Sequence, residues 1–127
     1  MSKRKTTIQN HKTDLRIRSY YFSIRVIKFL DKQPYSSVNK IIFNQVLRSV
    51  TSIGANIIEA KSSSSKRDFI KFYQISLKSA NESKYWFGLL RDAVNLNNNE
   101  INTLLSELEE ISNMLAASVL TMKNKKF

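Results

Sequence analysis

Apolar residues recur at helical spacing through most of this 127-residue chain, interrupted only by three short breaks. The first break contains Pro34, the second is a run of four serines, and the third contains Asn97, Asn98 and Asn99. Ser65 is placed to cap the helix that follows the serines, and Asp68 stands three residues further on, as in a capping box. The pattern predicts four helices, at about residues 14–32, 37–60 and 65–94, and from the asparagine turn to 122.

Two glycines and one proline are too few for the many turns of a β-sandwich or barrel, so we expect an all-α fold. The length suits one domain with one core. Because short connections make neighbouring helices antiparallel, the expected architecture is an antiparallel up-down-up-down four-helix bundle. We assign residues 14–122 to this bundle, 1–13 to a flexible basic N-terminal arm and 123–127 to a basic C-terminal tail.

Two of the predicted helices carry more apolar surface than one core needs. In the first, apolar residues from Tyr20 to Leu30 spread over roughly 220° of the circumference, whereas a core contact needs little more than about 100°. In the third, Ile70, Leu77 and Tyr85 lie beside the core stripe. That stripe is predicted to hold Phe69, Phe72, Ile75, Ala80, Trp86, Phe87, Leu90 and Val94. We therefore expect a homo-oligomer, the alternative being that aromatic residues overfill the core of a monomer.

The fourth predicted helix has one ordinary apolar stripe, which predicts an outer helix that meets its own core and water. Glu107, Glu109 and Glu110 lie off this stripe. The stripe consists of Ile101, Leu104, Leu105, Leu108, Ile111, Leu115, Val119 and Met122.

The chain has a formal net charge of +11, and the charge is unevenly placed. Residues 1–18 and 19–94 have a large basic excess, residues 95–122 contain only acidic charges, and the last five residues are basic again. Such a balance predicts attraction to a polyanion, with nucleic acid ahead of an anionic membrane surface. The alternative is that the lysine excess only maintains solubility.

Basic residues recur on predicted helix faces and at the C-terminus, where they are placed to follow the phosphates of a nucleic acid. Arg18, Arg25 and Lys32 repeat every seven residues on one side of the first helix. Exposed backbone N–H groups at the start of the third helix would also favour an anion. The candidate nucleic-acid-binding residues are Arg18, Arg25, Lys28, Lys32, Lys66, Arg67, Lys71, Lys78, Lys123, Lys125 and Lys126.

Stacking on bases requires exposed aromatic side chains beside such basic residues. Trp86 and Phe87 fall on the predicted core stripe and are interpreted as packing residues. Tyr20, Tyr21 and Tyr35 are better stacking candidates, with a structural role as the alternative.

No residue set resembles a catalytic, metal or cofactor site, so we expect a protein that is not an enzyme and needs no cofactor. The one histidine, His11, lies in the predicted arm, and the Glu-x-x-His pairs of di-iron bundles are absent. Gly54 and Gly88 are isolated within helices, so no glycine-rich phosphate loop exists. Asn56 and Glu59 predict a buried or interfacial polar contact, with Arg48 or a base of another subunit as the partner of Glu59.

We expect a cytoplasmic protein that does not bind membranes. The basic start of the chain is not followed by an apolar run, as a secretory signal would require. The longest uncharged run near the C-terminus has 12 residues, which is too short to span a bilayer.

The second and third predicted helices carry a two-part motif on either side of the serine run. It consists of Gln45, Arg48, Ser49, Ser52, Ile53, Asn56, Ile57, Glu59 and Ala60, then Phe69, Phe72, Ser76, Ser79 and Glu82. This motif resembles that of the 23S rRNA intervening-sequence proteins, and the similarity covers about residues 15–120. Gly54 stands where that family usually has proline, and Ala60 where it usually has glycine.

The resemblance implies a four-helix bundle that assembles as a ring, commonly a pentamer, with a role in binding RNA or DNA. A related branch, the accessory variability determinant of diversity-generating retroelements, partners a reverse transcriptase. Together, the residues and the resemblance lead us to expect a homo-oligomeric bundle that binds nucleic acid through its phosphates. The alternative is an accessory protein-interaction scaffold, for example a partner of a reverse transcriptase or another acidic protein.

Overall fold

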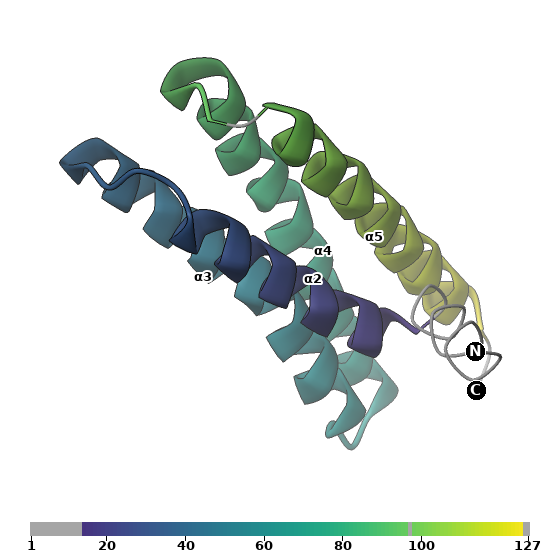
Figure 1. Ribbon diagram of the computed structural model, residues 1–127. Helices are drawn as coiled ribbons and strands as arrows, with labels where there is room; N and C mark the ends of the chain where they lie inside the picture. The colour runs from purple at the N-terminus through teal and green to yellow at the C-terminus, as the bar shows by residue number, and fades with distance from the viewer. Residues whose placement is uncertain (1–13, 97, 126–127) are drawn as a thin grey trace, which may run out of the picture.

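The computed structural model describes residues 14–96 and 98–125, and these form four long α-helices (Figure 1). Successive helices run in opposite directions, and α2 packs against α5 to close the bundle. The predicted all-α four-helix bundle is thereby confirmed. The helices are α2 (Leu15–Asp31), α3 (Ser37–Lys61), α4 (Lys66–Leu89) and α5 (Asn98–Asn124).

Short polar side chains start three of the helices. Asp14 accepts a hydrogen bond from the backbone N–H of Arg16, Ser36 accepts one from Asn39, and Ser65 accepts one from Asp68. Each satisfies an N–H group that has no partner within its helix. The predicted cap at Ser65 is therefore confirmed.

Two helix ends differ from the sequence prediction. The third helix reaches Val94 as expected, but its last turn, Leu90–Val94, is a π-helical segment (η1) that ends at the left-handed residue Asn95, with φ of 63°. The fourth helix continues to Asn124, so Lys123 belongs to α5 rather than to a tail.

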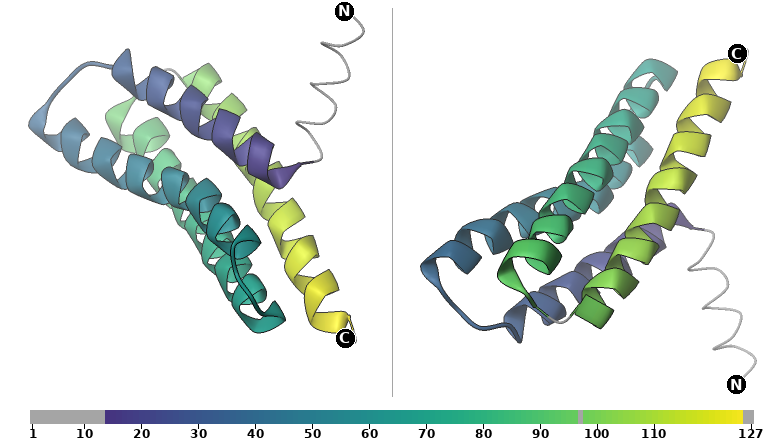
Figure 2. Two further views of the ribbon diagram at one scale, coloured as in Figure 1. Left: turned by 90° about the horizontal axis from the view of Figure 1, so that it is seen from below. Right: turned by 90° about the horizontal axis from the view of Figure 1, so that it is seen from above.

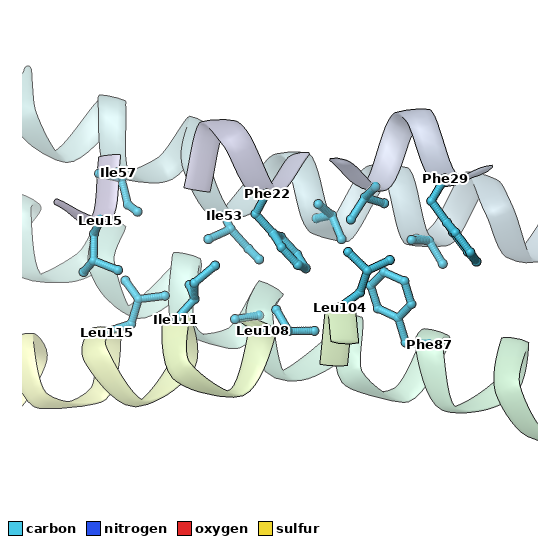
Figure 3. Packing of buried hydrophobic residues seen from close by; sticks show 14 of the residues in the cluster. Leu15, Phe22, Phe29, Ile53, Ile57, Phe87, Leu104, Leu108, Ile111 and Leu115 are labelled. Atoms are coloured by element: carbon cyan, nitrogen blue, oxygen red, sulfur yellow. The ribbon is translucent and has the colours of Figure 1, made fainter. Parts of the chain in front are cut away.

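The core lies between two layers, with α2 and α3 on one side and α4 and α5 on the other (Figure 2). Side chains from all four helices meet there, including Phe22, Ile53, Phe87 and Leu108, none of which is more than 1% exposed (Figure 3). The predicted stripe of the fourth helix is confirmed, except that Leu105 and Met122 are only partly buried.

The buried face of α4 differs from the predicted stripe. Phe69, Phe72 and Trp86 are only partly buried, whereas Ser76, Ser79 and Ser83 face the interior. These hydroxyls are buried because α3 supplies partners: Ser76 Oγ donates to the carbonyl oxygen of Ile53 at 2.8 Å. Small side chains on both helices also bring hydroxyl groups into direct contact, as between Ser83 and Ser49 at 2.8 Å.

Candidate nucleic-acid interface

The predicted basic row on the first helix is not a fully exposed surface, because Arg18 forms ion pairs with carboxylates inside the bundle. Its guanidinium donates to Glu107 of α5 at 3.1 and 3.2 Å and to Glu110 at 2.6 Å, and its side chain is only 11% exposed. These bonds, with burial acting in the opposite direction, raise the pKa of Arg18. Arg18 therefore holds α2 against α5.

Arg25 shares the same carboxylate, with Nη2 at 2.9 Å from Glu107 Oε1. Burial alone would raise the pKa of Glu107, but the bonds and charges of Arg18 and Arg25 outweigh burial and lower it. Glu107 thus offsets part of the charge of both arginines. Lys28 and Lys32 remain exposed near the C-terminal end of α2.

Basic residues from two distant parts of the sequence meet at the hinge between α3 and α4. Lys66, Arg67 and Lys71 of α4 and Lys123 of α5 line one groove of about 690 Å³. Lys66 Nζ donates to the carbonyl oxygen of Lys125 at 2.6 Å, which ties the start of α4 to the end of α5. We call these five residues the hinge cluster.

The outer face of α4 extends this positive surface away from the hinge. Arg67, Lys71 and Lys78 are exposed and lie within an arc of about 40° on the helix. Within residues 14–96 and 98–125, no carboxylate forms an ion pair with any of the three. Six of the predicted site residues thus form one surface, whereas Lys126 lies outside the described residues, as does the predicted N-terminal arm.

The three tyrosines expected to stack on bases lie away from this surface. Tyr20 and Tyr21 form an edge-to-face pair on α2, with ring centroids 5.6 Å apart, and Tyr35 is exposed in the α2–α3 connection. Tyr85, which the sequence pattern placed among the surplus apolar residues of the third helix and not among the stacking candidates, is exposed on α4 and lies on the same face as Arg67 and Lys78. Its heptad spacing from Lys78 was the signal that could have identified it.

Tyr20 and Tyr21 line an apolar groove of about 680 Å³ between α2 and α3, together with Gly54 and Ile58. Part of the wide apolar arc predicted for the first helix, including Tyr20, Tyr21 and Ile27, is therefore exposed, whereas residues such as Phe22 and Phe29 lie in the core. The second helix also exposes apolar residues, Val38, Ile41 and Ile58, which the sequence analysis did not single out.

The two-part motif forms the contact between α3 and α4. Ser52 and Ser79 are joined by a hydrogen bond of 2.9 Å, and the amide of Asn56 donates to Ser52 Oγ at 2.9 Å. Arg48 pairs with Glu82 rather than with Glu59, which is exposed. The earlier interpretation of Glu59 as the partner of Arg48 is wrong, because these residues are three turns apart on one helix whereas Glu82 lies across the contact.

Metal-binding clusters and membrane-spanning helices bear on other functions. Residues 14–96 and 98–125 contain no group of three or more His, Cys, Asp or Glu that could hold a metal ion. In the same part of the chain one helix, α3, is long and apolar enough to cross a membrane by length and composition alone, a property that core helices of soluble bundles share.

Comparison with known proteins agrees with this architecture. The family profile of the 23S rRNA-intervening sequence protein matches residues 12–117. The crystal structure of a protein with unknown function from the S23 ribosomal protein family of Bacteroides thetaiotaomicron is similar to this chain, with 34% sequence identity and a TM-score of 0.74. The match covers 84% of this chain and 98% of the other. No curated protein matches the sequence. From the profile match, the motif and the fold, the chain belongs to the family of 23S rRNA-intervening sequence proteins.

Proposed function

We propose that this protein is a non-enzymatic, cytoplasmic bundle that binds RNA or DNA through the phosphate backbone and works as a homo-oligomer, with a pentameric ring favoured. The observation that carries the proposal is the continuous positive surface formed by the hinge cluster and the outer face of α4. The α2 arginines do not contribute to this surface, whereas α5 contributes Lys123, so basic side chains from two helices are placed where a polyanion can reach them.

The expected contact is electrostatic. Each phosphate that a cation neutralises releases condensed counterions, so the logarithm of affinity falls with the logarithm of salt by about 0.9 per contact on duplex DNA. Arg67, Lys71, Lys78, Lys123 and Lys125 offer five contacts per protomer, which corresponds to a slope of about −4 to −5. Copies joined in a ring would multiply this weak contact through effective concentration.

Fluorescence anisotropy with labelled RNA and DNA at several salt concentrations tests the proposal. Wild-type protein should bind at about 50 mM salt with a steep salt dependence. The triple variant Arg67→Gln/Lys71→Gln/Lys78→Gln should lose most of the affinity and reduce the slope by about 3. No binding at low salt, or a flat salt dependence, would rule the function out.

A control variant of equal charge separates this surface from general attraction. Lys28→Gln/Lys32→Gln/Lys40→Gln removes three exposed cations remote from the hinge and lowers the net charge by the same amount. It should retain the wild-type slope to within about one contact. Equal losses in both triple variants would mean that binding follows net charge and has no defined surface.

The apolar groove between α2 and α3 supports self-association as part of the proposal. Groove residues such as Tyr20 and Ile58 leave apolar area in water that a second copy would cover. Light scattering should detect an oligomer at micromolar concentration, and Ile58→Glu should dissociate it. A wild-type monomer would contradict the assembly.

The same groove favours a second candidate function, an accessory scaffold for another protein such as a reverse transcriptase. A specific partner recovered after nuclease treatment should then be lost in Ile58→Glu and retained in the α4 triple variant. Loss in the α4 variant alone would instead indicate a partner whose acidic surface meets α4.

A further inference from the structure

Tyr85 extends the positive row of α4 with an exposed aromatic ring. Its side chain is 61% exposed, and it lies on the same arc as Arg67, Lys71 and Lys78. Tyr85 follows Lys78 by one heptad, about 10 Å along the axis at 1.5 Å per residue. Between the cations this face carries Gln74 and Asn81, so it is polar up to the ring.

The ring of Tyr85 contacts the ring of Trp86. It meets the edge of Trp86 with centroids 5.1 Å apart and planes at 67°. Trp86 is fixed in turn, because its Nε1 donates to Glu82 Oε2 at 2.8 Å and Glu82 pairs with Arg48 of α3. A ring with such support loses little side-chain entropy when a ligand packs against its open face.

The nearby carboxylate does not repel a polyanion approaching this face. Glu82 is the one acidic residue close to Lys78 on α4, and its charge is compensated by the guanidinium of Arg48. The hydrogen bond from Trp86, followed by that from Arg48, lowers the pKa of Glu82, so its carboxylate stays paired with Arg48 to lower pH than an ordinary glutamate would.

We propose that Tyr85 is a base-stacking platform at the end of the α4 phosphate row, so that this surface takes single-stranded nucleic acid. The inference rests on the proposed function and specifies its ligand. In a duplex the base faces are covered by neighbouring bases, whereas a single strand offers a free face to an exposed aromatic ring. Cations one heptad apart would hold the backbone while the ring receives a base.

Three ligands of equal length test this: a single-stranded RNA, a single-stranded DNA of the same sequence, and the corresponding duplex. Tyr85→Ala should weaken both single strands by about tenfold or more while leaving the duplex within about twofold. Tyr85→Phe keeps the ring and should retain the wild-type affinity. Equal loss on RNA and DNA indicates stacking alone, and a larger loss on RNA indicates an added contact to the 2′-hydroxyl.

Tyr35→Ala is the matched control, because it removes an exposed tyrosine from the α2–α3 connection, away from the basic surface and outside the apolar groove. It should bind all three ligands as the wild type does. Circular dichroism and the melting temperature of each variant establish that the fold is retained, which is expected because the Tyr85 side chain is mostly outside the core.

The single tryptophan provides an independent readout. Because Trp86 touches Tyr85, a base stacked on Tyr85 should change the fluorescence of Trp86, and the same strand with an abasic sugar at each position should not. No change of fluorescence with an intact bound strand would contradict the proposal.

These experiments distinguish failure of the Tyr85 stacking site from failure of the proposed phosphate-binding function. If Tyr85→Ala leaves single-strand affinity unchanged, or weakens duplex and single strand alike, the stacking site is refuted. Where the α4 triple variant still loses binding in that case, the proposed phosphate-binding function stands. If the wild type binds no nucleic acid at low salt, both the stacking site and the phosphate-binding function are refuted.

Discussion

Glu107 of α5 forms ion pairs with two arginines of α2. Replacing it with glutamine tests how much these ion pairs contribute to the free energy of unfolding. Its carboxylate accepts bonds from Arg18 at 3.1 and 3.2 Å and lies 2.9 Å from Arg25 Nη2. Glutamine keeps the size of the side chain and one acceptor oxygen but removes the negative charge. Arg18 then keeps its ion pair with Glu110, whereas Arg25 loses its ion pair with Glu107.

The expected loss of stability in Glu107→Gln depends on how exposed the paired side chains are. Exposed ion pairs contribute about 0–1 kcal/mol, whereas removing one partner of a buried pair costs about 3–5 kcal/mol. Arg18 and Glu107 are 11% and 20% exposed, close to the buried case, but Arg25 is half exposed and Glu110 still pairs with Arg18. We therefore expect Glu107→Gln to lower the free energy of unfolding by about 2 kcal/mol at neutral pH.

The effect should depend on pH with a defined sign. Because the folded pKa of Glu107 is lowered from the ordinary value of 4.5, its contribution is fully present above that value. It is lost as the pH falls through the lower folded pKa. The stabilities of wild type and Glu107→Gln should therefore converge in acid.

Urea unfolding followed by circular dichroism measures both quantities. Glu109→Gln is the matched control, because Glu109 forms a more exposed pair with Lys84, and this change should cost no more than about 0.5 kcal/mol. If Glu107→Gln is as stable as the control at neutral pH, or if its deficit persists undiminished in acid, these ion pairs do not hold the two helices together.

Two further predictions concern α4. Ser83→Val should destabilise the protein by about 1–3 kcal/mol, because Ser83 is buried 2.8 Å from Ser49 Oγ and a branched side chain would overpack the contact. In the same urea titration, Ser83→Ala should lower the free energy of unfolding by only about 1 kcal/mol. Equal losses in the two variants would contradict the close packing. Gly88→Ala should raise the free energy of unfolding by about 0.5–1 kcal/mol and the melting temperature by a few degrees, since nothing lies within 4 Å of the added carbon and alanine favours the helix. A fall in melting temperature would mean that Gly88 serves the adjoining π-helical turn.

The α3–α4 contact illustrates what periodicity alone misses. Apolar spacing placed Phe72 and Trp86 in the core, but serines occupy the interior face of α4 because hydroxyls can bond to the facing helix. A single-helix pattern ranks serine as a surface residue. Its burial depends on a partner such as Ser49, 34 residues earlier in the chain, which the pattern of one helix does not include.

The availability of the basic residues likewise depends on contacts between helices. Arg18 and Lys78 look alike in the sequence, as exposed members of a positive helix face. Only the arrangement of the helices brings Glu107, 89 residues away, against Arg18, while Lys78 remains without an ion-pair partner within the described residues.

The number of helices, their approximate ends, the bundle class and the excess of positive charge could be predicted from the sequence, because these depend on local spacing, caps and composition. The tertiary structure was needed to establish which cations are available to a ligand, that Tyr85 lies beside them, and which face of α4 is buried. Those properties depend on contacts between residues tens of positions apart, and charge and exposure are set by what lies across such a contact.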